Sequence, residues 1–327
     1  MKKRAKLMLI GSGITAVMMA LAESARHGVA DYFVGVALNR EIPPHPMGAE
    51  RRLVVRCADS VMLEQVARAG KAFASRPHEI VEIRAQDGTK LVGHWVSVEN
   101  PKRIIIAMHG WRSAWHRDFG MIADFFAQNN CSVLYAEQRA QGDSGGEYMG
   151  FGLIERHDCL DWINWVNGKT EKPMPVYLCG ISMGASTVLM AAGLELPDNV
   201  RGIIADCGYT SPVDIWKHVA KQAHISYGIC GKPAGRLAKK RLHMAMDEET
   251  CPQALSRSRT PVLFIHGTDD KFVPTQMTYE NFKACAAPRR LFIVPGAEHG
   301  MSYLVDTLGY ENAVKSFWAD FDGNISS

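Results

Sequence analysis

The most constraining feature of this sequence is the regular alternation of short apolar runs with amphipathic segments, which begins near residue 78. The run Arg103–Met108 is apolar after its first residue, as is typical of a strand buried on both faces of a parallel sheet. Apolar residues at helical spacing follow it: Phe119, Ile122, Ala123 and Phe126. Because this order repeats along the chain, the sequence predicts an α/β fold, in which helices cover both faces of a mostly parallel, doubly wound sheet.

The other expected elements keep to the same order. Two strand-like runs, His78–Gln86 and Lys90–Val98, flank the turn Asp87-Gly88 and predict a hairpin. Further strands are expected at Cys131–Ala136, Val176–Cys179, Val200–Ala205, Pro261–His266 and Arg290–Val294. Further helices are expected near Ile154–Val166, Ala185–Leu194 and Gln276–Ala286, and in a last segment with Val314, Phe317 and Phe321. Such sheets bind ligands beyond the carboxyl ends of their strands, so residues that directly follow the strands are the candidates for chemistry.

The composition excludes several classes of protein. The 327 residues include 37 Lys and Arg against 34 Asp and Glu, and four of the basic residues precede the first acidic one. The rest of the chain is therefore close to neutral, whereas nucleic-acid binding needs a concentrated basic face. No two of the eight cysteines lie closer than twenty positions, so there is no Cys-x-x-Cys motif for a metal or redox site. We expect no metal, no organic cofactor and no nucleic-acid partner.

The first 40 residues have the pattern of a targeting segment. Met1–Lys6 is basic, and Leu7–Ala22 is uncharged. As a helix, Leu7–Ala22 would span roughly 24 Å, which is less than the hydrocarbon core of about 30 Å. The small residues of Ala20-Leu21-Ala22 fit a cleaved secretory signal. An uncleaved anchor extended by Gly28–Leu38 is equally compatible, and an amphipathic helix packed on a cytosolic body is the third alternative.

These alternatives define the expected domain organisation. We expect residues 1–40 to be a signal or membrane-anchor segment that associates with the membrane, and residues 41–77 to be a linker. The basic end of such a segment stays in the cytoplasm, so the body of the chain, residues 78–322, would lie outside the cell membrane or be secreted. Under the third alternative, the protein is cytoplasmic.

The pentapeptide Gly180-Ile181-Ser182-Met183-Gly184 lies between an expected strand and an expected helix. In that context G-x-S-x-G is typical of a sharp turn that exposes a serine above the sheet, with glycines where a Cβ would clash. The following helix points its N-terminal N–H groups toward charge that develops at the serine. We therefore interpret Ser182 as a candidate nucleophile; the alternative is a buried serine of a structural turn.

A serine nucleophile needs a histidine base that a carboxylate orients, with the acid and then the histidine later in the chain. His266–Pro274 directly follows one expected strand and contains Asp269 and Asp270. Pro295–Gly300 directly follows the next strand and contains His299. Both segments therefore lie at carboxyl ends of strands, in the required order.

With these motifs the chain resembles the α/β-hydrolase superfamily over roughly residues 78 to 322. The H-G-x-x-D-x-x-V-P element of that superfamily matches His266–Pro274. This match implies that the acid is Asp270 rather than Asp269, and that the base is His299. Within the superfamily the chain is similar to bacterial serine esterases with an N-terminal signal-anchor, relatives of the serine aminopeptidase and cinnamoyl-esterase group.

An oxyanion hole requires two N–H donors that point to the carbonyl oxygen as it gains charge. The backbone N–H of Met183, directly after the nucleophile, is one candidate. The resemblance to the H-G-x loop of the family implies that the backbone N–H of Trp111, in His109-Gly110-Trp111, supplies the other.

A long interval separates two expected strands at about residues 207–260 and predicts a small helical cap over the serine. Between Pro212 and Ala245 the chain has seven Lys and Arg against one acid, Asp214. A solvated helix face is one interpretation of this pattern. The other is that the cap favours anionic lipid surfaces or acyl groups that carry a carboxylate.

The residues together predict a serine hydrolase that cleaves carboxylic esters by two-step acyl transfer. The expected substrate is a small ester, anionic or lipid-like. Two alternatives use the same three side chains, a peptidase of the serine aminopeptidase type and a thioesterase. A remote alternative is a non-catalytic binding module on a hydrolase fold.

Overall fold

The computed structural model describes residues 23–24, 26–44 and 58–323. Within these residues one sheet has the strand order β1-β2-β4-β3-β5-β6-β7-β8. β2 pairs antiparallel with β1 and β4, and the other neighbouring strands are parallel. The strands are β1 (Glu79–Arg84), β2 (Lys90–Val96), β3 (Arg103–Met108), β4 (Cys131–Glu137), β5 (Val176–Ile181), β6 (Val200–Asp206), β7 (Val262–Gly267) and β8 (Arg289–Val294). The expected mostly parallel sheet is confirmed.

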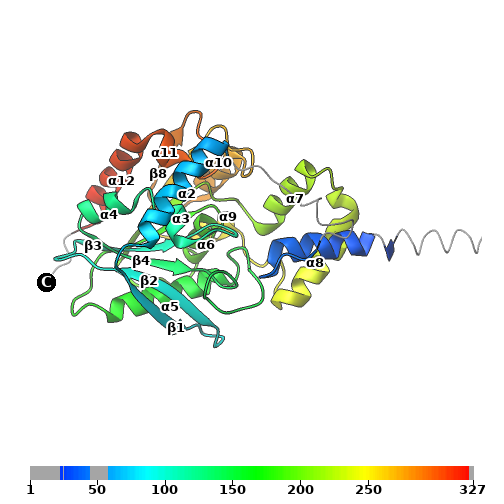
Figure 1. Ribbon diagram of the computed structural model, residues 1–327, viewed down its shortest axis with the longest axis horizontal. Helices are drawn as coiled ribbons and strands as arrows, with labels where there is room; N and C mark the ends of the chain where they lie inside the picture. Colours follow the sequence, from blue (N-terminus) through cyan, green and yellow to red (C-terminus); the bar gives the residue numbers. More distant parts are fainter. Residues whose placement is uncertain (1–22, 25, 45–57, 324–327) are drawn as a thin grey trace, which may run out of the picture.

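Helices flank the sheet on both sides (Figure 1). Their bounds are α2 (Ser60–Ala74), α3 (Trp115–Phe119), α4 (Ala123–Gln128), α5 (Glu155–Gly168), α6 (Met183–Ala191), α7 (Pro212–Gln222), α8 (Tyr227–Leu242), α9 (Cys251–Arg257), α10 (Thr275–Ala284), α11 (Ser302–Val305) and α12 (Thr307–Phe321). In the central strand β3, Ile104 and Ile106 belong to one apolar core, whereas Ile105 and Ala107 belong to another. This alternation places a core on each face of the sheet, because successive side chains of a strand point to opposite faces.

One expected helix is divided in two. The apolar pattern predicts a continuous helix through Phe119 and Phe126, but α3 ends before Gly120 and α4 follows. At Gly120 a Cβ would lie 2.8 Å from the backbone of Gly70 in α2. The two glycines therefore allow α2 to pack directly on α3. α2 lies in the stretch expected to be a linker, residues 41–77. Its side chains Val66 and Phe73 are buried.

The insertion after β6 forms α7 and α8, as the sequence predicts, and also α9, which it does not. α7 begins with Pro212 and is capped by the side chain of Ser211, which accepts a hydrogen bond from the N–H of Asp214. The apolar side of α8, with Ala234, Ala238 and Leu242, is buried in the main core. α7 and α8 lie beside the end of the sheet (Figure 1).

The basic and uncharged segments Met1–Lys6 and Leu7–Ala22 lie outside the described residues. Residues 26–38 are helical, and this helix runs alongside α8 in Figure 1. Its side chains Ala30, Val34 and Leu38 are fully buried in the main core. In the described part of the chain, no helix combines the length and apolar character needed to cross a membrane.

Candidate active site

Ser182 occupies a strained turn between β5 and α6. Its φ of 57° and ψ of −117° are unusual for a residue that has a Cβ. The flanking glycines are required by close backbone approach: a Cβ on Gly180 would lie 2.2 Å from the oxygen of Gly184, and a Cβ on Gly184 would lie 1.9 Å from that of Met108. The sequence therefore folds into a turn that holds Ser182 at the carboxyl end of the central strands.

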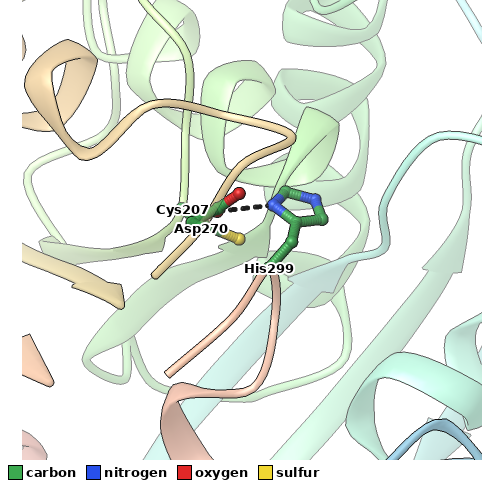
Figure 2. A group of neighbouring side chains, drawn as sticks. All are labelled: Cys207, Asp270 and His299. Atoms are coloured by element: carbon green, nitrogen blue, oxygen red, sulfur yellow. Dashed lines mark hydrogen bonds and ion pairs between the residues drawn. The ribbon is translucent and has the colours of Figure 1, made fainter. Parts of the chain in front are cut away.

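The structure brings Ser182, His299 and Asp270 together, although they are far apart in the sequence. Ser182 Oγ lies 2.9 Å from His299 Nε2. On the other side of the ring, His299 Nδ1 lies 2.7 Å from an Asp270 oxygen, and Figure 2 shows this contact. All three side chains are buried. A histidine bonded in this way can take the proton of the serine hydroxyl while the carboxylate holds the ring in place.

The Asp270 carboxylate is held in one orientation by several donors. One oxygen accepts hydrogen bonds from the N–H groups of Phe272, at 2.9 Å, and Val273, at 2.8 Å. Burial raises the pKa of Asp270, but the His299 charge and the hydrogen bonds from His266 and His299 outweigh it, so the pKa lies well below its ordinary value. The carboxylate therefore stays ionised at neutral pH.

His266 supports this carboxylate rather than reacting itself. Its Nε2 lies 2.9 Å from the carbonyl oxygen of Val273 and 3.1 Å from Asp270. Because a carbonyl oxygen only accepts, Nε2 carries a proton and donates to both. Nδ1 can then accept from the Thr278 hydroxyl, 2.7 Å away.

Three carboxylates raise the pKa of His299. Burial disfavours the imidazolium ion, but the charge and hydrogen bond of Asp270, with contributions from Asp206 and Asp118, outweigh burial and raise the pKa. Asp206 ends β6, and its side chain accepts from the Ser302 hydroxyl at 3.1 Å. Burial raises the pKa of Asp206 itself to about 6. Near neutral pH, its negative charge stabilises a protonated His299.

Cys207 lies next to the same pair of side chains (Figure 2). Cys207, Asp270 and His299 each have one possible metal-ligand atom, and these three atoms lie within 4.8 Å of one another. A metal would need a thiolate, yet burial holds the pKa of Cys207 well above its ordinary value. It would also need a ring nitrogen of His299, and both are hydrogen-bonded, Nδ1 to Asp270 and Nε2 to Ser182. The chemistry of these donors fits a proton relay better than a metal site.

One candidate oxyanion donor, Met183, directly follows Ser182 in the chain, and the other, Trp111, lies in a loop whose Gly110 approaches Ser182. Met183 is the first residue of α6. Trp111 follows Gly110, whose N–H donates to Asp118 at 2.7 Å. The Ser113 hydroxyl donates to the other oxygen of the same carboxylate. Asp118 therefore fixes both ends of the loop that contains Trp111. Among the described residues, neither the N–H of Met183 nor that of Trp111 has a hydrogen-bond partner, so both can serve a ligand.

A cavity of about 270 Å³ opens at Ser182 and His299. Its apolar wall includes Leu63 and Val66 of α2, and Met301 and Leu304 from the segment after His299. These side chains suit an acyl chain better than a polar group. α2 thus forms part of the cavity wall, which no pattern in the sequence indicates.

In the described part of the chain, the insertion contributes no side chain to this wall. The cavity residues come from α2, from residues 110–122, from the carboxyl ends of β5 and β6, from the segments that follow β5, β7 and β8, and from α12, but none from α7 or α8. Trp111 lines the cavity. Trp115 and Trp216 are buried in the two cores instead, since Trp115 stacks on His94 and Trp216 packs edge-on against Phe33.

Sequence reasoning missed Asp118 and Asp206. Asp206 had a detectable signal, because it directly follows the expected strand Val200–Ala205, as the other candidates follow theirs. Asp118 had none, since its bonds to Gly110 and Ser113 depend on how the loop folds. Asp269, the neighbour of the predicted acid, is exposed and accepts a hydrogen bond from the Thr268 hydroxyl.

The sequence of this chain is similar to one protein family and to bacterial proteins. The model of the family described as serine aminopeptidase, S33, matches residues 99–221. The uncharacterized protein YqkD of Bacillus subtilis is 27% identical over 234 residues, which cover 70% of this chain and 75% of YqkD. The uncharacterized protein YfhR of Escherichia coli is 25% identical over 229 residues, which cover 68% of this chain and 73% of YfhR.

Solved structures show the same fold. The Pyrococcus furiosus esterase Pf2001 is 19% identical with a TM-score of 0.61, and the match covers 82% of this chain and 97% of the esterase. Est1E of Butyrivibrio proteoclasticus, solved with bound ferulic acid, is 19% identical with a TM-score of 0.58, and the match covers 74% of this chain and 98% of Est1E.

Proposed function

We propose that this chain, which has the α/β-hydrolase fold, is a serine hydrolase that cleaves carboxylic esters. The observation that carries the proposal is the hydrogen-bonded series from Ser182 Oγ through His299 to Asp270, with distances of 2.9 and 2.7 Å. This arrangement is what a serine needs to become a nucleophile at neutral pH.

The proposed reaction has two steps. His299 Nε2 takes the proton of Ser182 while Oγ attacks the ester carbonyl, and the N–H groups of Met183 and Trp111 stabilise the resulting oxyanion. The imidazolium then gives its proton to the leaving alcohol, which leaves an acyl-serine. In the second step His299 takes a proton from water, the hydroxide oxygen attacks the acyl carbon, and the proton returns to Ser182 as the carboxylic acid leaves. Neither step requires a cofactor.

Three grounds favour an ester substrate, and the first of them, the leaving group, separates esters from amides only. An alcohol is a better leaving group than an amine, the cavity at Ser182 has an apolar wall, and two of the structural neighbours are an esterase and a ferulic-acid-binding Est1E. The match to the serine aminopeptidase family favours a peptidase as the second candidate. A thioesterase would use the same machinery.

The substrate is further proposed to be anionic or lipid-like. Four exposed bases, Lys232, Arg236, Lys239 and Lys240, are spaced i, i+4, i+7 and i+8 and so share one face of α8. Because no cavity residue comes from α8, this basic face fits an anionic surface around the site better than a carboxylate inside it. We also propose that residues 1–22 attach the protein to a membrane, with the body outside. The helix formed by residues 26–38 would then hold the basic face close to lipid.

A panel of substrates with one shared acyl group tests the class of reaction. We expect the alkyl ester to be turned over with a higher kcat/KM than the aminoacyl amide or the thioester, and we expect a fluorophosphonate to label the protein. A higher kcat/KM for either rival would reassign the substrate class, and no labelling together with no turnover would leave a binding module. Neutral and anionic esters of equal length, at low and high salt, complete the panel. An anionic preference that salt does not weaken would contradict the role of the basic face.

The pH dependence of kcat/KM should have its acid limb above pH 6.5, the ordinary pKa of histidine. Protonated His299 cannot accept the Ser182 proton, so activity is lost as the pH falls through the raised pKa of His299. Rates between about pH 5 and pH 9 check this expectation. Asp206→Asn should move the limb to lower pH, because it removes a charge that stabilises the imidazolium. A wild-type limb well below pH 6.5 would contradict the assignment.

A further inference from the structure

The C-terminal end of the N-terminal helix is bonded to the loop that carries a candidate oxyanion donor. We call residues 26–40, which comprise this helix and its last turn, the N-terminal strap. The final carbonyls of a helix have no partners within the helix and need donors from elsewhere. Five consecutive strap carbonyls find such donors in the body of the chain: Val36, Ala37, Leu38, Asn39 and Arg40.

Trp111 and Arg112, in the loop from Gly110 to Ser113, supply most of these donors. The Arg112 guanidinium donates to the Val36 oxygen at 2.7 and 3.1 Å. It also donates to the Asn39 oxygen at 2.6 Å and to the Arg40 oxygen at 3.1 Å. The indole N–H of Trp111 donates to the Ala37 oxygen at 2.8 Å. A guanidinium presents five donors in a rigid fork, and a positive charge at a helix C-terminus is favourable.

These bonds bear on the position of the Trp111 backbone N–H. On one side of Trp111, Gly110 is fixed by Asp118. On the other side, Arg112 has a φ of 50°, which a non-glycine residue rarely adopts without support. The bonds of the Arg112 side chain to the strap provide that support. The N–H of Trp111 therefore lies between two fixed points, one inside the loop and one on the strap.

The strap is itself firmly attached. Phe33 packs edge-on against Trp216 of α7, with ring centroids 5.4 Å apart. The Arg241 guanidinium of α8 forms an ion pair with Asp31 at 2.7 Å. Beyond the helix, the N–H of Arg40 donates to the Glu147 carbonyl at 2.8 Å. A strap held in these ways can position the loop instead of following its motion.

We propose that Arg112 is a positioning residue for catalysis and that the N-terminal strap is part of the catalytic apparatus. Through Arg112 and the Trp111 indole, the strap holds the Trp111 N–H where the oxyanion develops. This inference rests on the proposed serine hydrolase function. It assigns a role in the reaction to residues that the sequence places in a targeting segment outside the catalytic domain.

Kinetics of Arg112→Ala and Arg112→Lys in the full chain test the proposal. Complete removal of one oxyanion donor typically lowers kcat by 10²–10³-fold, so a displaced donor should lower it by about 10- to 100-fold, with KM nearly unchanged. Lysine keeps the charge but lacks the fork, so its kcat should lie between those of wild type and Arg112→Ala. Arg84→Ala is the matched control, because Arg84 also donates to a backbone carbonyl, that of Gly88, in a hairpin away from the site.

A boronic acid provides a readout that a purely structural role would not change. Its boron accepts Ser182 Oγ, the serine proton passes to His299, and an oxygen of the tetrahedral boronate occupies the oxyanion hole. For Arg112→Ala, affinity for the boronic acid should fall by about the same factor as kcat/KM, while the pH midpoint stays in place. Phe33→Ala loosens the strap from the other side, and in the double variant its effect on kcat should not multiply with that of Arg112→Ala.

The outcomes separate this proposal from the proposed function. If wild type hydrolyses esters and Arg112→Ala matches Arg84→Ala in kcat and boronate affinity, the strap has no catalytic role. If Arg112→Ala fails to fold, Arg112→Lys and Phe33→Ala decide by the same two readouts. If wild type neither hydrolyses esters nor reacts with a fluorophosphonate, the proposed function fails, and the positioning role fails with it.

Discussion

Ser182→Ala should abolish ester hydrolysis, with a decrease in kcat of about 10⁶-fold. Without Oγ, His299 has no hydroxyl to activate and no acyl-enzyme can form. Alanine keeps the Cβ, so the backbone at φ 57° is no more strained than before, and the unfolding temperature should hardly change. Steady-state kinetics measure the loss of kcat, fluorophosphonate labelling tests for the nucleophile, and thermal unfolding of the same preparation measures stability. Hydrolysis that persists at a hundredth of the wild-type rate would place the nucleophile elsewhere.

Ser186→Ala is the matched control for this experiment. Ser186 is a buried serine within α6, four residues after Ser182, and its hydroxyl accepts from the Tyr209 N–H at 2.8 Å. Its removal leaves that buried N–H without a partner, which should cost about 1–3 kcal/mol of stability. The two variants should therefore separate: Ser182→Ala loses activity and keeps stability, whereas Ser186→Ala loses stability and keeps kcat.

The sheet and the candidate residues Ser182, Asp270 and His299 could be predicted because local sequence patterns indicate them. A run such as Arg103–Met108 is apolar on both faces only in a strand covered on both sides, and the structure confirms its bounds. Gly180 and Gly184 mark a turn that excludes a Cβ, so Ser182 could be placed without knowledge of its partners. Positions directly after strands indicated Asp269, Asp270 and His299 as candidates, and the resemblance to α/β-hydrolases implied Asp270 rather than Asp269.

The surroundings of the site could not be predicted because they depend on contacts between distant segments. The role of Arg112 requires the carbonyls of residues 36–40, more than seventy positions earlier, and a single arginine in a loop does not indicate them. The same is true of α2, whose contribution to the cavity depends on Gly70 meeting Gly120. The insertion after β6 could likewise be predicted, whereas the direction in which its helices pack could not.

Asp270→Asn should lower kcat by about 10⁴-fold and leave the protein folded. An asparagine amide that faces His299 Nδ1 favours the tautomer with the proton on Nε2, which cannot then accept the Ser182 proton. The side-chain oxygen can still accept from the N–H groups of Phe272 and Val273, so the loop keeps its shape. Steady-state kinetics with the preferred ester measure the decrease.

The neighbouring carboxylates make this experiment specific. Asp269→Asn removes a charge one residue away, but Asp269 is exposed, so its kcat should stay within about twofold of wild type. Asp206 is the other buried acid near His299, and it contributes to the raised pKa of that histidine. If Asp270→Asn keeps more than a hundredth of the wild-type kcat and the further change Asp206→Asn removes it, then Asp206 can orient the base and Asp270 is not the sole acid.

The pH profile of the residual activity distinguishes the two acids independently. Asp270 is the largest contributor to the raised pKa of His299 after the opposing effect of burial. With its charge gone, burial dominates, and the acid limb of kcat/KM should move to lower pH than in wild type. A limb that stays in place would mean that Asp206, rather than Asp270, stabilises the imidazolium and that the short contact between Asp270 and His299 has little energetic effect.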